Sequence, residues 1–276
     1  MRKIFSSAAL LMTAAALWAV PAHAQFRGVE GSFVRTLNIS GAVDLDVSTG
    51  SGSIDIRRGA TNTVEVRGRI RAGGDWFRSN QDVNAVVRDL EANPPIEQTG
   101  SSIRIGRTSN RDSERNVSIS YEITVPANTS VRAHTGSGSQ TISGISAGLE
   151  AGTGSGSITL TDVTGDISAN TGSGTIKATG VRGGLRMHTG SGGISIDGEQ
   201  TGRWDLETGS GGIEIRLPRN ASFDLSAHTG SGGVYVDYPM TVQGRIDSNR
   251  RDVRGTVGSG AYALTARTGS GRIRIE

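Results

Sequence analysis

The sequence predicts an all-β protein, folded as a single-stranded β-solenoid (β-helix) of about 18-residue repeats with one short amphipathic helix. Three observations predict this fold: a recurring glycine tetrapeptide, alternating apolar and polar residues around it, and one segment with helical periodicity. A β-hairpin meander in a sandwich or propeller would also accommodate these strands. The fixed spacing favours the solenoid, because identical coils must superpose for their strands to pair.

The tetrapeptide Thr-Gly-Ser-Gly sets the length of the repeat. Copies begin at positions 49, 135, 153, 171, 189, 208, 229 and 268. From 135 to 189 they start 18 residues apart, and the next two intervals are 19 and 21 residues. Glycine adopts backbone angles that other residues resist, so we expect tight corners here and second corners at pairs such as Thr164-Gly165 and Thr179-Gly180.

Apolar and polar residues alternate on both sides of each tetrapeptide. Leu185 and Met187 precede one copy, and Ile194 and Ile196 follow it. Alternation with period two, rich in β-branched residues, indicates strands with one buried face. Each repeat is therefore expected to contain two strands and two corners, with inward columns of Ile, Val and Leu.

One segment, residues 80–92, has helical rather than strand periodicity. It places three valines and Leu90 on one helical face, and Asn93-Pro94-Pro95 ends it. An open solenoid end exposes unpaired backbone and apolar side chains. We therefore expect this helical insertion to cover an end or a side of the solenoid.

The first 24 residues have the pattern of a cleaved signal peptide. Arg2 and Lys3 precede an apolar stretch over 8–20, and Ala22-His23-Ala24 supplies a cleavage pattern. The stretch is shorter than the roughly 20 residues of a membrane-spanning helix, which favours cleavage over an uncleaved anchor. The rest, 25–276, is expected to be one solenoid domain, exported to the periplasm or the cell surface, without stable membrane insertion. The absence of cysteine excludes disulfides.

The charge balance argues against a nucleic-acid partner. Without residues 1–24 the chain has 27 basic (29 minus Arg2 and Lys3) and 26 acidic side chains, a net charge of +1. The basic residues are interspersed with acidic ones, whereas a phosphate-backbone binder clusters them on one face.

Several segments together resemble a known family. They are the Thr-Gly-Ser-Gly-x-Ile repeats, the helix followed by Pro94-Pro95 and the Gly-Ser-x-Ile-Arg-Ile segment 100–105, and Tyr-Glu-Ile-Thr-Val-Pro-Ala-Asn-Thr-Ser-Val at 121–131. From about Phe33 to Glu276 the chain resembles the bacterial "putative adhesin" family of unknown function, whose β-solenoid has been likened to a toast rack. The resemblance implies a β-solenoid in the cell envelope and supplies no catalytic residues.

The glycine tetrapeptides do not indicate a phosphate or cofactor site. A phosphate-binding loop leads into a helix, whereas every copy here leads into another strand. Eight equivalent serines also cannot all be nucleophiles, because each would need its own base and orienting group. We expect the serines to cap backbone groups at the corners, and we expect no cofactor.

Three histidines, His134, His188 and His228, share the position before a tetrapeptide and are expected to form one column. His188 and His228 would then lie two coils apart, about 10 Å, with Glu207 between them. Zinc needs ligand nitrogens about 2 Å from the metal, so these residues predict surface His–Glu contacts and no metal site.

Carboxylates near one corner, Asp44, Asp46 and Asp55, alternate with apolar residues and should therefore point to solvent. A glycosidase needs two carboxyl groups facing each other across a cleft. The pattern supplies no such cleft, and no catalytic residue is predicted.

The densest charge cluster lies between 245 and 254, where the repeat spacing opens, and predicts a protruding loop. Arginine is suited to contacts with carboxylates and phosphates. Arg245, Arg250, Arg251 and Arg254 are therefore the candidate contacts of an anionic ligand.

These observations favour a non-enzymatic cell-envelope protein, an adhesin or surface-binding module that presents an extended solenoid face to an envelope protein or glycan. A periplasmic structural or assembly protein that self-associates through its solenoid ends is the first alternative. A carbohydrate-active β-helix enzyme is the least favoured.

Overall fold

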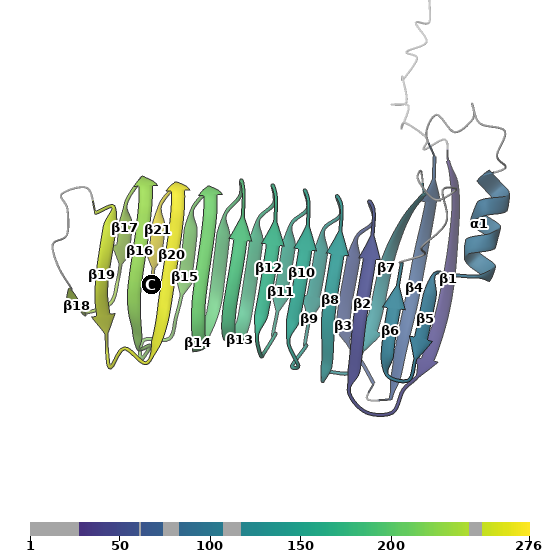
Figure 1. Ribbon diagram of the computed structural model, residues 1–276, viewed down its shortest axis with the longest axis horizontal. Helices are drawn as coiled ribbons and strands as arrows, with labels where there is room; N and C mark the ends of the chain where they lie inside the picture. Colours follow the sequence, from purple (N-terminus) through teal and green to yellow (C-terminus); the bar gives the residue numbers. More distant parts are fainter. Residues whose placement is uncertain (1–27, 61, 74–82, 107–116, 243–249) are drawn as a thin grey trace, which may run out of the picture.

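The computed structural model describes residues 28–60, 62–73, 83–106, 117–242 and 250–276. They form a β-solenoid in which two ladders of strands lie side by side along one long axis (Figure 1). The predicted fold class is thereby confirmed. The predicted signal peptide, 1–24, lies outside the described residues.

Face 1 is the ladder of strands that precede the tetrapeptides, together with the strands that extend it at both ends. In spatial order it contains β5 (Ile96–Thr99), β6 (Ser102–Ile105), β2 (Val43–Thr49), β8 (Thr129–Thr135), β10 (Leu149–Thr153), β12 (Ile167–Thr171), the second parts of β13 (Ile176–Thr189) and β14 (Ile194–Ser210), β20 (Tyr262–Ser270), β16 (Phe223–Ser231), β19 (Asp252–Val257) and β18 (Met240–Val242).

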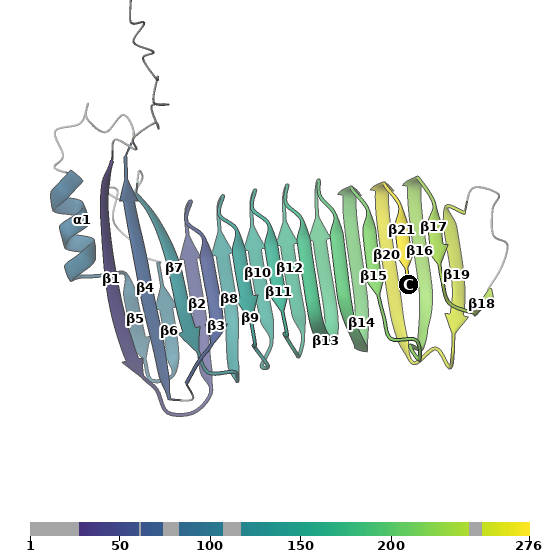
Figure 2. The ribbon, with the colours of Figure 1, turned by 180° about the vertical axis from the view of Figure 1, so that it is seen from behind.

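Face 2 is the ladder of strands that follow the tetrapeptides (Figure 2). In spatial order it contains β1 (Val29–Asn38), β4 (Thr63–Ala72), β7 (Val117–Val125), β3 (Ile54–Arg58), β9 (Gln140–Ser143), β11 (Ile158–Thr161), the first parts of β13 and β14, β15 (Ile213–Arg216), β21 (Ile273–Ile275) and β17 (Val234–Val236). The central pairs are parallel and in register, as expected for stacked coils.

Two coils lie out of sequence order. The coil of β2 and β3 lies between β6/β7 and β8/β9, although it precedes both in the chain. The last coil, β20 and β21, likewise lies between β14/β15 and β16/β17. The axial order of the coils therefore differs from the order of the repeats in the sequence.

The core lies between the two faces and follows the predicted alternation. Leu185, Met187, Ile194 and Ile196 are each at most 1% exposed, while the residues between them face outward. Trp204 is fully buried, and its indole N–H donates a 2.9 Å hydrogen bond to the Gly183 carbonyl. Burial of each large apolar side chain contributes about 1.5–3 kcal/mol, so the stacked columns supply the main stabilisation of the fold.

Threonine, and not serine, caps the tetrapeptide corners. The Thr171 hydroxyl accepts a hydrogen bond from the Gly174 N–H (3.1 Å) and donates one to the Gly156 carbonyl of the neighbouring coil (2.8 Å). Equivalent threonines bond the neighbouring coil along the stack, at 135, 153, 189, 208, 229 and 268. The prediction that serine caps these corners is therefore wrong: the threonine hydroxyl accepts the corner N–H, and the serines of all eight tetrapeptides are exposed.

Most tetrapeptide glycines are needed for close approach rather than for unusual backbone angles, and Gly232, with a φ of 141°, is an exception. A Cβ on Gly174 would lie 1.8 Å from the Gly156 carbonyl oxygen of the neighbouring coil, and one on Gly172 would lie 2.4 Å from the Gly154 oxygen. Neither glycine has a positive φ. The second corners do use that conformation, with φ of 102° at Gly165.

The predicted helix forms as α1 (Val83–Ala92) and covers the N-terminal end of the solenoid (Figure 1). It contacts β1 and β4 and buries Val87 and Leu90, as the helical spacing predicts. Gly31 of β1 lets the helix approach, since a Cβ there would lie 2.5 Å from a Val87 methyl group. The Arg35 guanidinium donates to the carbonyls of Glu91 (3.2 Å) and Ala92 (2.9 Å), which otherwise lack partners at the helix end.

Candidate binding groove on face 1

The outward residues of face 1 stand in columns, because every coil has the same register. One column crosses the molecule through Arg104, Asp46, Arg132, Glu150, Ser168, Arg186, Asp205, Thr265, Ser226 and Arg254. The signs of charge are mixed along it, and neighbours pair across coils, as Arg132 does with Asp44 at 2.8 Å. Such exposed pairs add little stability.

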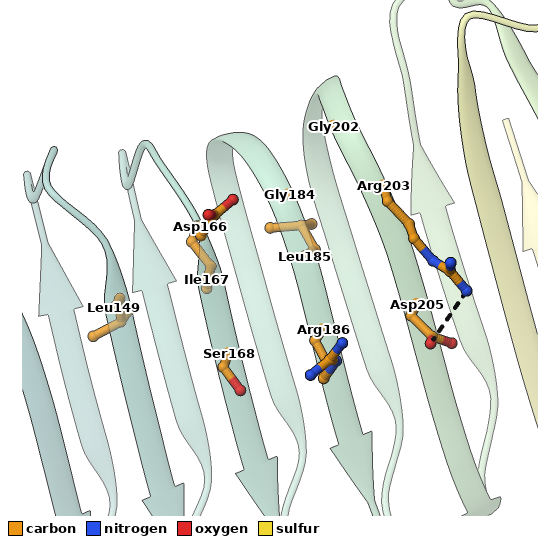
Figure 3. A pocket seen from close by; sticks show the side chains of 10 residues that line it. All are labelled: Leu149, Asp166, Ile167, Ser168, Gly184, Leu185, Arg186, Gly202, Arg203 and Asp205. Atoms are coloured by element: carbon orange, nitrogen blue, oxygen red, sulfur yellow. Dashed lines mark ion pairs between the residues drawn. The ribbon is translucent and has the colours of Figure 1, made fainter.

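A groove of about 370 Å³ opens in the middle of this face, across β10, β12, β13 and β14 (Figure 3). Leu149, Ile167 and Leu185 form its apolar floor, and each is at most 4% exposed. The groove exists partly because Gly184 and Gly202 carry no side chain. At 202 packing requires glycine, since a Cβ there would lie 2.9 Å from the Gly184 nitrogen.

The polar lining of the groove supplies both signs of charge. Asp205 lies 4.0 Å from the Arg203 guanidinium and 3.8 Å from that of Arg267 on the next strand. Asp166 and Arg186 also line the groove, and neither forms an ion pair within the described part of the chain. With the Ser168 hydroxyl, the groove thus presents a carboxylate, a guanidinium and a hydroxyl above an apolar floor.

The predicted arginine cluster lies elsewhere. Arg254 is on strand β19 and lies 3.4 Å from Asp252, so the prediction of a protruding loop is wrong for this part. The Arg250 carbonyl accepts a 2.9 Å hydrogen bond from the Val234 N–H, and the Arg251 carbonyl accepts one of the same length from the Thr229 N–H. β19 is separated from the groove strand β14 by β20 and β16. Arg245 lies outside the described residues.

The histidine column forms, but its order differs from the prediction. His134 lies 4.0 Å from Glu150, and His188 lies 3.8 Å from Glu207. Glu207 does not neighbour His228, because the last coil inserts Arg267 between them.

His228 instead lies 3.7 Å from Asp252 on β19. The predicted surface His–Glu contacts thus form at His134 and His188, whereas His228 lies beside an aspartate. Among the described residues no group of three or more His, Cys, Asp or Glu could hold a metal ion.

The predicted outward carboxylates separate onto the two faces. Asp44 and Asp46 lie on β2 of face 1, whereas Asp55 lies on β3 of face 2 and pairs with Arg57 at 2.6 Å. Two carboxyl groups on opposite faces cannot act on one glycosidic bond. The groove itself was not predicted, although glycine at 184, where the preceding coil has Asp166, is a signal for it.

Comparison with known proteins identifies the family. The Toastrack DUF4097 profile matches residues 40–276. The chain belongs to the Toastrack family. This confirms the resemblance drawn from the sequence. No curated protein matches this Toastrack chain.

Three solved structures are similar to this Toastrack chain. A "putative cell adhesion protein" from Clostridium sporogenes is 14% identical, with a TM-score of 0.34, and the match covers 90% of this chain and 99% of that one. A "putative adhesin" from Bacteroides fragilis is 12% identical, with a TM-score of 0.39 and coverage of 89% and 97%. A "putative lipid binding protein" from Parabacteroides distasonis is 15% identical, with a TM-score of 0.43 and coverage of 89% and 96%.

In the described part of this Toastrack chain no helix is long and apolar enough to cross a membrane.

Proposed function

We propose that this protein is a non-enzymatic, exported surface-binding module of the adhesin type, and that its face 1 groove binds a glycan of the cell envelope. The observation that carries the proposal is the groove itself, in which Asp166 and Arg186 have no ion-pair partner among the described residues. A glycan both donates and accepts hydrogen bonds at each sugar unit. The groove offers donors on Arg186 and acceptors on Asp166, with the Ser168 hydroxyl between them.

The geometry of face 1 supports binding rather than catalysis. The groove is shallow and open to solvent, whereas an active site for glycoside cleavage holds the bond between two carboxyl groups. Because the parallel strands repeat at about 4.8 Å, the surface suits repeated weak contacts with a polymer.

Binding is tested with purified residues 25–276 on immobilised peptidoglycan sacculi, dextran and mannan. We expect the protein to bind at least one of these immobilised polymers. We expect Arg186→Ala and Asp166→Ala each to weaken that binding by about tenfold. Arg104→Ala is the matched control, because Arg104 lies in the same outward column but five strands away. Equal binding by all four proteins would contradict the proposed role of the groove.

Export is tested by protease shaving of intact cells that carry a tagged chain, with a periplasmic marker as the control. Digestion with the marker spared would support a role at the cell surface. Protection until the outer membrane is opened would contradict an adhesin and favour a periplasmic structural or assembly role. Concentration-dependent oligomers would further support that alternative.

A further inference from the structure

Face 2 contains a second depression, built from glycines of a different kind. In three coils the tetrapeptide is followed by an extra glycine, Gly193, Gly212 and Gly233. The equivalent residues of the other five coils are Ser53, Ser139, Ser157, Thr175 and Arg272. On face 2 the two neighbouring glycines 193 and 212 leave a trough of about 410 Å³, bordered by Thr175 on one side and Arg272 on the other.

Packing does not require glycine at 193, and at 212 it leaves only limited room for a side chain. A Cβ on Gly193 would lie 3.5 Å from the Gly212 carbonyl oxygen, and one on Gly212 would lie 3.3 Å from the Arg272 oxygen. By contrast, a Cβ on Gly192, one residue earlier, would lie 2.0 Å from a neighbouring carbonyl oxygen. Neither Gly193 nor Gly212 has a positive φ. The fold thus accepts a side chain at 193, and its absence serves to keep the trough open.

An exposed aromatic ring lies beside Arg272, the residue that borders the trough at its C-terminal side. Tyr235 on β17 is 43% exposed in a chain with only 4% aromatic residues, so it contributes little to the core. A Cβ on Gly233 would lie 3.1 Å from the Tyr235 ring, so glycine at this position leaves room for it. The Arg272 guanidinium lies 5.3 Å from the ring centroid, within cation–π distance.

The charges around the trough leave one cation for a ligand. Arg274 pairs with Glu276 at 2.7 Å and with Asp237 at 3.3 Å. Arg272, in contrast, forms no ion pair with any described residue, and its Tyr235 contact fixes the guanidinium beside the trough. Ser195, Thr175 and Glu214 complete the polar lining, and the Glu214 carboxylate is paired with Arg216.

We propose that this trough binds an acidic saccharide, a uronic-acid unit of a polysaccharide. The apolar face of the sugar stacks on Tyr235, its carboxylate pairs with Arg272, and its hydroxyls bond Ser195 and Thr175. This site goes beyond the proposed function, because the trough lies on the face opposite the groove. One molecule could thereby hold two polymer chains at once.

The test measures binding of oligogalacturonate and of oligomannuronate to purified residues 25–276 by calorimetry. We expect Gly193→Ser to weaken binding by about tenfold or more. The substitution places in the trough a serine side chain, the one that Ser157 has at the equivalent position of an earlier coil. Tyr235→Ala and Arg272→Ala should each have a similar effect, and Tyr235→Phe should bind like the wild type. Oligomers whose carboxyl groups have been reduced to alcohols should bind more weakly.

Two control variants distinguish a loss of binding in the trough from a general folding defect and from an effect of the face 1 groove. Ser157→Thr adds one methyl group at the same register outside the trough and should leave binding unchanged. Arg186→Ala should also leave it unchanged, so that failure of the groove proposal is distinguished from failure of this one. Equal binding by wild type, Gly193→Ser and Tyr235→Ala, or no binding of either oligomer at millimolar concentration, would overturn the proposal.

Discussion

At the scale of single residues, the tetrapeptide threonine joins neighbouring coils. The hydroxyl of Thr171 satisfies the Gly174 N–H of its own corner and the Gly156 carbonyl of the next coil, and the residue is only 4% exposed. Each buried polar group at the corner thus has a partner, which a stack of bare glycine turns would not supply.

Replacement of Thr171 by valine keeps the shape of the side chain and removes both hydrogen bonds. Because a buried donor and a buried acceptor lose their partner, we expect the free energy of unfolding to fall by about 1–3 kcal/mol in urea titrations. Thr159→Val is the control, since Thr159 faces outward on β11 and should change stability by less than about 0.5 kcal/mol. Equal losses in both variants would show that the corner bonds contribute nothing specific.

Tyr238 predicts how stability changes at high pH. Burial raises the pKa of Tyr238 above its ordinary value of 10.0, and Glu276 nearby adds to the effect. Its hydroxyl donates a 2.6 Å hydrogen bond to the Leu217 carbonyl. Because the unfolded chain ionises first, the stability that the neutral phenol contributes is complete below pH 10 and is lost as pH rises toward the folded pKa.

We therefore expect the wild type to lose more stability than Tyr238→Phe as the pH rises above about 10, measured by denaturant unfolding at each pH. At neutral pH the variant should be less stable by about 1 kcal/mol, because it lacks the hydrogen bond. Parallel pH profiles of the two proteins would contradict this account.

At the scale of the element, the corner contains glycines with two separate purposes. Gly174→Ala would bring a Cβ within 1.8 Å of backbone oxygen, whereas the nearest atom to a Cβ at Gly193 lies at 3.5 Å. We expect the first variant to lose about 2 kcal/mol or more of unfolding free energy and the second to lose almost none. Thermal unfolding of the two variants tests this, and similar losses would refute the distinction.

Sequence patterns predicted most elements because they determine which side of a strand is buried. The spacing of Val87 and Leu90 predicted the helix, and the alternation at Leu185 and Met187 predicted the buried face. Patterns could not reveal the order of the coils, because the corners are chemically equivalent. Thr171 bonds Gly156 of the preceding repeat in the same way that Thr268 bonds Gly211 of a repeat two copies earlier.

The groove and the trough escaped prediction for the same reason. Each depends on which side chains lie side by side across coils, and in the trough Arg272 borders Gly212 only because the last coil inserts there. The arginine cluster, chosen from charge density and from the wider repeat spacing, contains Arg254 on a strand outside both sites.

At the scale of the whole molecule, the interleaved coils predict an unusual effect of truncation. Removal of residues 262–276 deletes β20 and β21 from between β14/β15 and β16/β17, so β16 loses its parallel neighbour. We expect amides of 223–236 and 252–257 to lose protection in hydrogen exchange, while those of 129–197 stay protected. Protection of β16 after the truncation would show that it pairs with β14 directly.

The place of the last coil also sets an order of events during synthesis. A chain that emerges N-terminus first, from a ribosome or through a translocation pore, exposes β16 before the strand that must lie beside it exists. The coil of β16 and β17 therefore cannot join the stack until residues 262–275 have been delivered, whereas the coils from β8 to β14 can assemble as they appear. Closure of this end of the solenoid thus depends on strands that emerge after the ones they hold in place.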